Sequence, residues 1–182
     1  MHKFAKKKNM ERLIIDMDNV MADISTQFQR WYTKSTGIVI DPQTLIGKPE
    51  PEAFPDRELV WSFLFTPGFF KDVPVMKDSQ EVMAELNKKY EVFIVSSALE
   101  FPQSLPEKFG WLQQHFPFLN WKQIVFCGSK NVIKGDYMID DYLKNLDYFD
   151  GVRMLYTAPH NQLLEGHNRV NNWQEIAQVL LK

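Results

Sequence analysis

The sequence predicts an α/β fold in which helices flank a central parallel sheet, a Rossmann-like arrangement. Three observations lead to this prediction. Short apolar runs alternate along the chain with segments whose apolar residues recur at helical spacing. The runs are continuous, as in strands buried on both faces of a parallel sheet. Several runs stop abruptly at acids or hydroxyls, and ligands of such sheets bind at the carboxyl ends of the strands.

The first half of the chain contains one predicted strand and two predicted helices. The strand is the run at residues 13–15. Apolar residues at helical spacing mark the first helix, which Gly37 is expected to end: Ile24, Phe28, Trp31 and Tyr32. Residues 38–56 contain four prolines and are predicted to be an irregular connection. Residues 57–65 are rich in aromatic side chains and predict a second helix, after which residues 66–70 turn the chain.

The second half alternates predicted strands with predicted helices. The strands are expected at residues 92–95, 124–126, 137–139 and 152–156. Two capping boxes each predict the start of a helix. The first is Asp78 with Glu81, and the second is Ser104 with Glu107. The inward faces of these helices are expected to carry Val82, Met83 and Leu86, and then Leu105, Phe109, Leu112 and Phe116. Apolar residues also mark a closing helix: Trp173, Ile176, Val179 and Leu180.

Composition indicates an ordinary water-soluble domain. The 182 residues are 45% hydrophobic and 24% charged, and no apolar stretch reaches the roughly 18 residues of a membrane span. The single cysteine, Cys127, excludes an internal disulfide and a multi-cysteine zinc site. We therefore expect a cytoplasmic protein without a membrane partner. The sequence is compatible with an oligomer.

The charge distribution is uneven. Four lysines lie in residues 1–9, which are predicted to be a disordered basic leader, and the remainder holds 17 basic and 23 acidic residues. A nucleic-acid polymer is not expected as a partner, because an acidic body does not attract phosphate backbones. The alternative, in which the leader binds nucleic acid, predicts binding that weakens steeply with salt.

Acids follow two of the predicted strands. Asp16 and Asp18 come directly after the first strand, and Asp140 with Asp141 directly after the run at 137–139. Two carboxylates ~4 Å apart repel by about 4 kcal/mol at an effective dielectric near 20, so such a pair needs a cation, a shared proton or solvent. Mg2+ is a common natural solution. In the alternative interpretation, Asp16 caps the next helix and Asp18 is solvated.

The order of these features resembles the haloacid dehalogenase (HAD) superfamily of phosphotransferases. The chain presents a strand with D-x-D, a strand ending in serine, a lysine, and a strand with two acids. The resemblance implies a HAD-like Rossmannoid core at residues 10–23 and 77–182, with a small helical cap inserted at residues 24–76. It implies that Asp16 is the nucleophile, forming an aspartyl-phosphate, and that Asp18 is the general acid and base.

The same resemblance implies the phosphate and metal contacts. Ser96 donates to phosphate, with Ser97 as its competitor, and Lys130 supplies positive charge, with Lys134 as its rival. The Mg2+ ligands are expected to be the Asp16 carboxylate, the Asp18 backbone carbonyl and one of Asp140 or Asp141. Asp136 is a weaker outer-shell candidate.

Within the superfamily the chain is most similar to the 5'(3')-deoxyribonucleotidases. DMDNVMAD resembles their DMDGVLAD, FIVSSA their FICTSP, and YMIDD their LIDD. The resemblance implies a small phosphomonoester substrate, a deoxynucleotide, whose base packs on Ile24 and on Phe69 or Phe70, with Trp61 as a further candidate. Two positions depart from the pattern: Asn19 replaces the usual glycine, and Ile24 stands where the mammalian enzymes carry an aromatic residue.

Two other functions are kept as alternatives. A phosphatase for another small metabolite, such as a sugar phosphate, would use the same core residues. A non-catalytic HAD-fold binding protein would have no need of an acid and base at Asp18.

Overall fold

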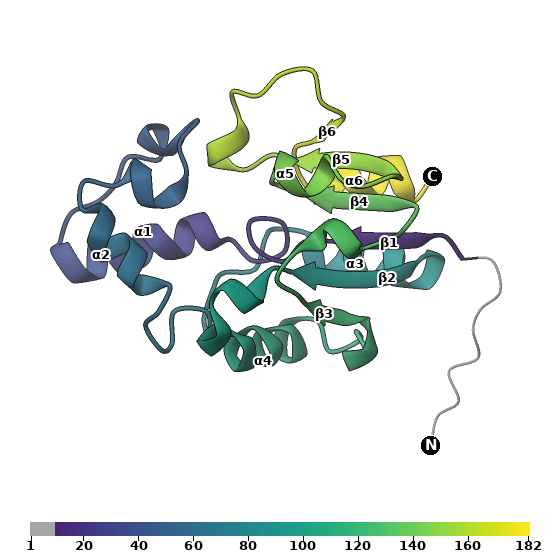
Figure 1. Cartoon of the computed structure of the whole chain (residues 1–182), viewed down its shortest axis with the longest axis horizontal. Helices are drawn as coiled ribbons and strands as arrows, with labels where there is room; N and C mark the ends of the chain where they lie inside the picture. Colours follow the sequence, from purple (N-terminus) through teal and green to yellow (C-terminus); the bar gives the residue numbers. More distant parts are fainter. Residues whose placement is uncertain (1–9) are drawn as a thin grey trace.

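The computed structural model describes residues 10–182, and the predicted leader at residues 1–9 lies outside them. Six strands form one sheet in the order β3-β2-β1-β4-β5-β6, and all neighbours pair in parallel (Figure 1). The strands are β1 Arg12–Ile15, β2 Glu91–Ser96, β3 Ile124–Phe126, β4 Tyr137–Asp140, β5 Val152–Tyr156 and β6 Arg169–Val170. The predicted α/β fold is thus confirmed. Only β6 had no sequence signal, because two residues are too few to show a pattern.

Six α-helices connect and flank these strands in the described chain. They are α1 Ile24–Thr36, α2 Arg57–Phe63, α3 Ser79–Lys89, α4 Leu105–His115, α5 Leu143–Leu146 and α6 Trp173–Leu180. Helix α1 ends at Gly37 as predicted, and this glycine takes the left-handed conformation (φ 75°) that favours its residue type. The proline-rich connection contains two short 3-10 turns, Pro42–Leu45 and Glu50–Ala53. No helix within residues 10–182 is long and apolar enough to cross a membrane.

The sheet has a large core on one face and a smaller one on the other. Successive residues of a strand point to opposite faces. Leu13 and Ile15 accordingly join the core that includes residues of α3, α4 and α6, whereas Ile14 joins a second cluster with Met138 and Leu146. Burial on both faces explains why the strands are continuous apolar runs.

Two predicted capping boxes are wrong. Neither Asp78 nor Ser104 makes a side-chain hydrogen bond to the start of its helix. Asp78 has φ 64°, outside the extended region from which a side chain can reach back to the first turn. Glu107, assigned to the second box, bonds instead to the backbone of Gly68 and Phe70. In α6, Val179 is 59% exposed and does not belong to the inward face.

Residues 24–76 lie beyond the carboxyl ends of the strands, towards which the arrows point in Figure 1. The two ends of this segment meet. Ala22 and Val75 form an antiparallel bridge, and the Met76 amide donates to the Met21 carbonyl over 2.8 Å. The segment therefore leaves the sheet and returns to it at one point.

Candidate active site

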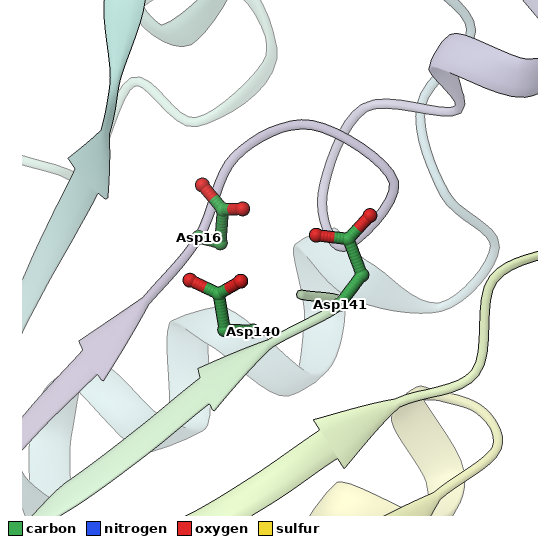
Figure 2. Close-up of side chains that lie close together, drawn as sticks. All are labelled: Asp16, Asp140 and Asp141. Carbon is green, nitrogen blue, oxygen red and sulfur yellow. The ribbon is translucent and has the colours of Figure 1, made fainter. Parts of the chain in front are cut away.

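Three carboxylates converge at the carboxyl edge of the sheet. Strands β1 and β4 are neighbours with Ile15 opposite Ile139, so the next residue along each chain segment, Asp16 after β1 and Asp140 at the end of β4, emerges beside the other. Asp141 turns towards the same point, as Figure 2 shows, and each residue offers an oxygen within 4.8 Å of the others. All three are buried. The predicted proximity of the two acidic motifs is present in the fold.

Lys130 lies between two of these acids. Its ammonium is 2.7 Å from Asp16 Oδ1 and 2.7 Å from Asp140 Oδ2. Burial favours the neutral amine, but the two carboxylates outweigh it and raise the pKa of Lys130 above its usual value. The rival Lys134 is exposed and pairs with Asp150. Lys130 alone of the two reaches the acid cluster.

The adjacent acids Asp140 and Asp141 have different surroundings. Asp140 accepts hydrogen bonds from Lys130, from the Tyr142 amide at 2.9 Å and from Asn145 Nδ2 at 2.9 Å. Asp141 Oδ2 accepts only from Asn19 Nδ2 at 3.1 Å, and Asp141 Oδ1 is buried without a hydrogen-bond partner in the described chain. A buried carboxylate oxygen of this kind is costly unless a ligand satisfies it.

The protonation of the cluster reflects a surplus of negative charge. Burial, with repulsion from Asp140 and Asp18, raises the pKa of Asp16 to about 6 despite the opposing effect of Lys130. Burial and the neighbouring acids Asp16, Asp140 and Glu50 raise the pKa of Asp141 well above its usual range. Three acids face one ammonium here. The donor set of carboxylate oxygens fits a hard divalent cation at this point.

Asn19 stands where the resembled family usually carries a glycine. Its φ of 56° is left-handed, a conformation that asparagine tolerates better than most residues. Its side-chain amide donates to Asp141 Oδ2 and, at 2.8 Å, to Glu50 Oε1, while its oxygen accepts from the Ser25 hydroxyl at 3.0 Å. Asn19 thus connects the acid cluster to the segment beyond the sheet.

Asp18 has a lysine partner that the sequence did not suggest. The ammonium of Lys108, on α4, donates to Asp18 Oδ2 and lies 4.6 Å from the centre of the Phe70 ring. The Lys108 side chain is only 2% exposed. Its inward position could have been read from its spacing to Leu105 and Leu112, but lysine is rarely assigned to a buried face.

A cavity of about 240 Å³ opens above the cluster. Its floor, here called the acidic floor, is formed by Asp16, Asp18, Ser96, Ser97, Lys130 and Asp141. Its apolar lining, here called the apolar wall, includes Ile24, Phe28, Trp61, Leu64 and Phe70. Both candidate serines line the cavity, so the structure does not separate them. The floor presents charge and the wall presents apolar surface to one bound molecule.

Of the residues considered for the site from the sequence, Phe69, Lys134, Asp136 and Asp140 do not line this cavity. The Phe69 ring packs edge-to-face on that of Phe70, with 5.0 Å between the ring centroids, but does not reach the cavity. The Phe69 ring is fully buried, with its centroid 4.9 Å from that of Phe28 and 5.2 Å from that of Trp31. Phe70 is therefore the member of the pair that lines the cavity. Asp136 precedes β4 and accepts from the Arg12 amide at 2.6 Å, at the opposite edge of the sheet.

Solved structures share the fold of this chain. The HAD-type protein YfnB of Bacillus subtilis, solved with bound magnesium, superimposes with a TM-score of 0.55 over 96% of this chain and 100% of its own, at 11% identity. A HAD-superfamily hydrolase of Geobacter sulfurreducens gives 0.52 over 94% and 96%, at 14% identity. The fold is that of the HAD superfamily.

Sequence comparison narrows the class to one family. Residues 9–182 match the family model described as 5' nucleotidase, deoxy (pyrimidine), cytosolic type C protein, and the chain belongs to this family of nucleotidases. The 5'(3')-deoxyribonucleotidase of Bacillus subtilis is 36% identical over 173 residues, which cover 94% of this chain and 100% of the relative. The protein of the same name from Bacillus phage SPbeta shows the same identity and coverage.

Proposed function

We propose that the protein is a Mg2+-dependent phosphatase that removes phosphate from deoxyribonucleoside 5'(3')-monophosphates through an aspartyl-phosphate on Asp16. The observation that carries the proposal is the pairing of the acidic floor with the apolar wall in one cavity. The floor offers a phosphate the Lys130 ammonium, the serine hydroxyls and carboxylates that can hold a cation, and the wall offers a nucleoside apolar surface. The names of the relatives support the same substrate class.

The reaction is proposed to run in two displacements. In the first, an Asp16 carboxylate oxygen attacks phosphorus, the bond to the leaving oxygen breaks, and Asp18 gives that oxygen a proton. In the second, Asp18 takes a proton from water, whose oxygen attacks phosphorus and displaces the Asp16 carboxylate. Lys108 orients Asp18 by binding one of its oxygens. Phosphate and a nucleoside leave, and both acids return to their starting state.

Lys130 and the strand-end serines are proposed to bind the phosphoryl group. The Lys130 ammonium already spans Asp16 and Asp140, so it holds the nucleophile in place and offsets part of the charge of an arriving dianion. Ser96 ends β2 and Ser97 follows it, and either hydroxyl is placed at the cavity to donate to a phosphate oxygen.

The metal ligands are proposed to be the Asp16 carboxylate, the Asp18 carbonyl and the Asp141 carboxylate. Asp141 is preferred over Asp140 because its Oδ1 is the buried oxygen without a partner, whereas both oxygens of Asp140 accept hydrogen bonds. Mg2+, when bound, would neutralise phosphoryl oxygens during transfer. Lys130 and Asn145 fix Asp140 beside the ligands, and Asn19 orients Asp141.

Residues 24–76 are proposed to form the cap that selects the substrate, over a core of residues 10–23 and 77–182. Its two ends meet at the Ala22–Val75 bridge, as an insertion requires. Ile24, Trp61 and Phe70 from this segment line the cavity and are proposed to contact the base. The family description, which contains the word cytosolic, supports a cytoplasmic location.

The test is a panel of phosphomonoesters assayed for phosphate release with Mg2+ and with a chelator. Deoxynucleoside monophosphates, the matching ribonucleotides and sugar phosphates are compared at equal concentration. We expect deoxynucleotides to be turned over with the highest kcat/KM and the chelator to abolish release. Preferential turnover of sugar phosphates would instead assign the protein to the alternative substrate class.

A further inference from the structure

A carboxylate of the core holds the loop that carries Phe70. Glu107, in the first turn of α4, accepts from the Gly68 amide at 2.5 Å through Oε1 and from the Phe70 amide at 3.0 Å through Oε2. Gly68 has φ 94°, a conformation that a residue with a side chain rarely adopts. Both oxygens of one carboxylate are therefore committed to a single short loop.

This use of Glu107 is not explained by the helix that contains it. An acid at this place ordinarily completes a capping box, but the Ser104 side chain makes no capping bond and its hydroxyl is buried without a partner in the described chain. Glu107 bonds instead to residues 37 and 39 positions earlier in the sequence. Hydrogen bonds from amides to an ionised acceptor are among the stronger ones in proteins.

The loop lies between a fixed residue and the cavity. Phe69 is anchored among aromatic rings, and its carbonyl accepts from Gln27 Nε2 at 2.7 Å. Phe70, the next residue, points to the cavity and is 4% exposed. The backbone between these two rings sets the position of the Phe70 ring, and the Phe70 amide in that backbone donates to Glu107.

We propose that Glu107 is a positioning residue for substrate selection, which fixes the Phe70 ring on the apolar wall through the amides of Gly68 and Phe70. The inference rests on the proposed function, in which a nucleobase packs on that wall. Asp16 and Asp18 are held by ion pairs with Lys130 and Lys108, and Glu107 takes part in neither pair. Lys108 also lies 4.6 Å from the centre of the Phe70 ring, so a displaced ring weakens that contact without breaking the ion pair with Asp18. Losing the link should therefore penalise substrates that carry a base much more than those that do not.

The first experiment compares Glu107→Gln with Glu81→Gln. The amide keeps the size of Glu107 but replaces one acceptor with a donor, so one of the two bonds to the loop is lost. Glu81 is the matched control, because it also lies in the first turn of a helix, α3, and is exposed. In Glu107→Gln we expect the KM for a deoxynucleoside monophosphate to rise about tenfold, with kcat/KM for glycerol 2-phosphate unchanged within about twofold.

A double-mutant cycle with Phe70→Leu tests whether Glu107 acts through Phe70. The double variant should show about the same KM for the deoxynucleotide as Phe70→Leu alone, because the ring that Glu107 positions is already absent. Additive effects, an equal loss on both substrates, or no change in Glu107→Gln would each overturn the proposal. Where Glu107→Gln does not fold, Glu107→Asp shortens the reach while keeping the charge, and the same split between substrates is expected.

Hydrogen–deuterium exchange gives a readout without substrate. Peptides covering residues 66–70 should exchange about tenfold faster in Glu107→Gln than in Glu81→Gln. If the wild type cleaves glycerol 2-phosphate but no deoxynucleotide, the proposed function and base selection by Glu107 both fail. Faster exchange in Glu107→Gln would then show only that Glu107 holds the loop in the wild type. Unchanged exchange with a wild type that cleaves deoxynucleotides would overturn the positioning role alone.

Discussion

The acidic floor and the apolar wall of the cavity are built on different physical principles. On the floor, the buried Lys130 ammonium lies 2.7 Å from an oxygen of Asp16 and 2.7 Å from an oxygen of Asp140, which is buried beneath the floor residues. The wall offers Ile24, Phe70 and similar side chains, without a charge of their own. Electrostatic contacts depend sharply on distance and pairing, whereas apolar contact scales gradually with area. Changes on the floor should therefore abolish reaction with every substrate, and changes on the wall should alter the choice of substrate.

The largest effect is expected from Asp16→Asn. Removal of the proposed nucleophile should lower kcat by about 10⁴-fold or more for all substrates, because an amide does not form the phosphoenzyme. The fold should remain, since Asp16 is one of three acids that face a single ammonium and its pKa is raised to about 6. Single-turnover assays and thermal unfolding measure the two effects.

The matched control for this change is Asp147→Asn, an exposed aspartate after α5. It should retain wild-type turnover. Deoxynucleotide hydrolysis at a normal rate by Asp16→Asn would reject Asp16 as the nucleophile.

Lys130→Met should combine a large loss of activity with a loss of stability. Removing one partner of a buried ion pair leaves the other charge uncompensated and costs about 3–5 kcal/mol. Here Asp16 and Asp140 both lose their ammonium, although Asn145 still bonds to Asp140. We expect kcat/KM to fall at least about 100-fold and the free energy of unfolding in urea to drop by about 3 kcal/mol.

Lys134→Met is the comparison that makes this prediction specific. Its ammonium is exposed and pairs with an exposed Asp150, so solvent screens the pair and the unfolding free energy should stay close to that of the wild type. Equal effects of the two substitutions would contradict the distinction between the lysines.

Asp141→Asn should mainly weaken metal binding. Its buried Oδ1 is the proposed metal ligand, and an amide is a poorer donor to a hard cation. We expect the Mg2+ concentration for half-maximal activity to rise about tenfold to 100-fold, and the increase in melting temperature caused by Mg2+ to shrink accordingly. Asp136→Asn, at the opposite edge of the sheet, should leave both quantities unchanged.

Metal binding should also weaken in acid. Burial raises the pKa of Asp16 to about 6, so below that pH its carboxyl group is increasingly protonated, and protons compete with the metal. From pH 7.5 to 5.5 this group alone should weaken Mg2+ binding about fourfold. The raised pKa of Asp141 acts in the same direction. Calorimetric titration of the free protein checks this, and an affinity that is independent of pH would contradict it.

The parallel sheet and the shared edge of its acids followed from local sequence. Continuous apolar runs end at Asp16, at Ser96 and at Asp140, and the carboxyl ends of parallel strands share one edge. Once the strands are recognised, the acids after β1 and at the end of β4 are expected on the same edge of the sheet, and they meet because β1 and β4 are neighbours in the sheet, an order that the sequence did not predict. The sequence could not predict that Asp140 and Asp141 have different surroundings. The difference arises because Lys130 and Asn145 bond to Asp140 and not to Asp141.

The wall was harder to predict because long-range contacts create it. Lys108 is buried through an ion pair with Asp18, 90 residues away, and Glu107 is turned from its helix towards Gly68. Helical spacing shows which residues share a face but not which partner meets them. For the same reason, the sequence could not say which of Phe69 and Phe70 points to the cavity.

The smallest predicted effect concerns Trp61, which lines the cavity while 46% of its surface remains exposed. Its ring lies 6.0 Å from that of Phe101, so removal leaves the rim of the wall incomplete without emptying a core. Stacking on a half-exposed ring contributes less than full burial, and Trp61→Leu should raise the KM for deoxynucleotides about threefold. Glycerol 2-phosphate should be unaffected. Trp121→Leu, whose exposed ring lies outside this cavity, is the control. A fall in kcat for both substrates in Trp61→Leu would mean that the wall supports the floor, and the separation between the two regions would not hold.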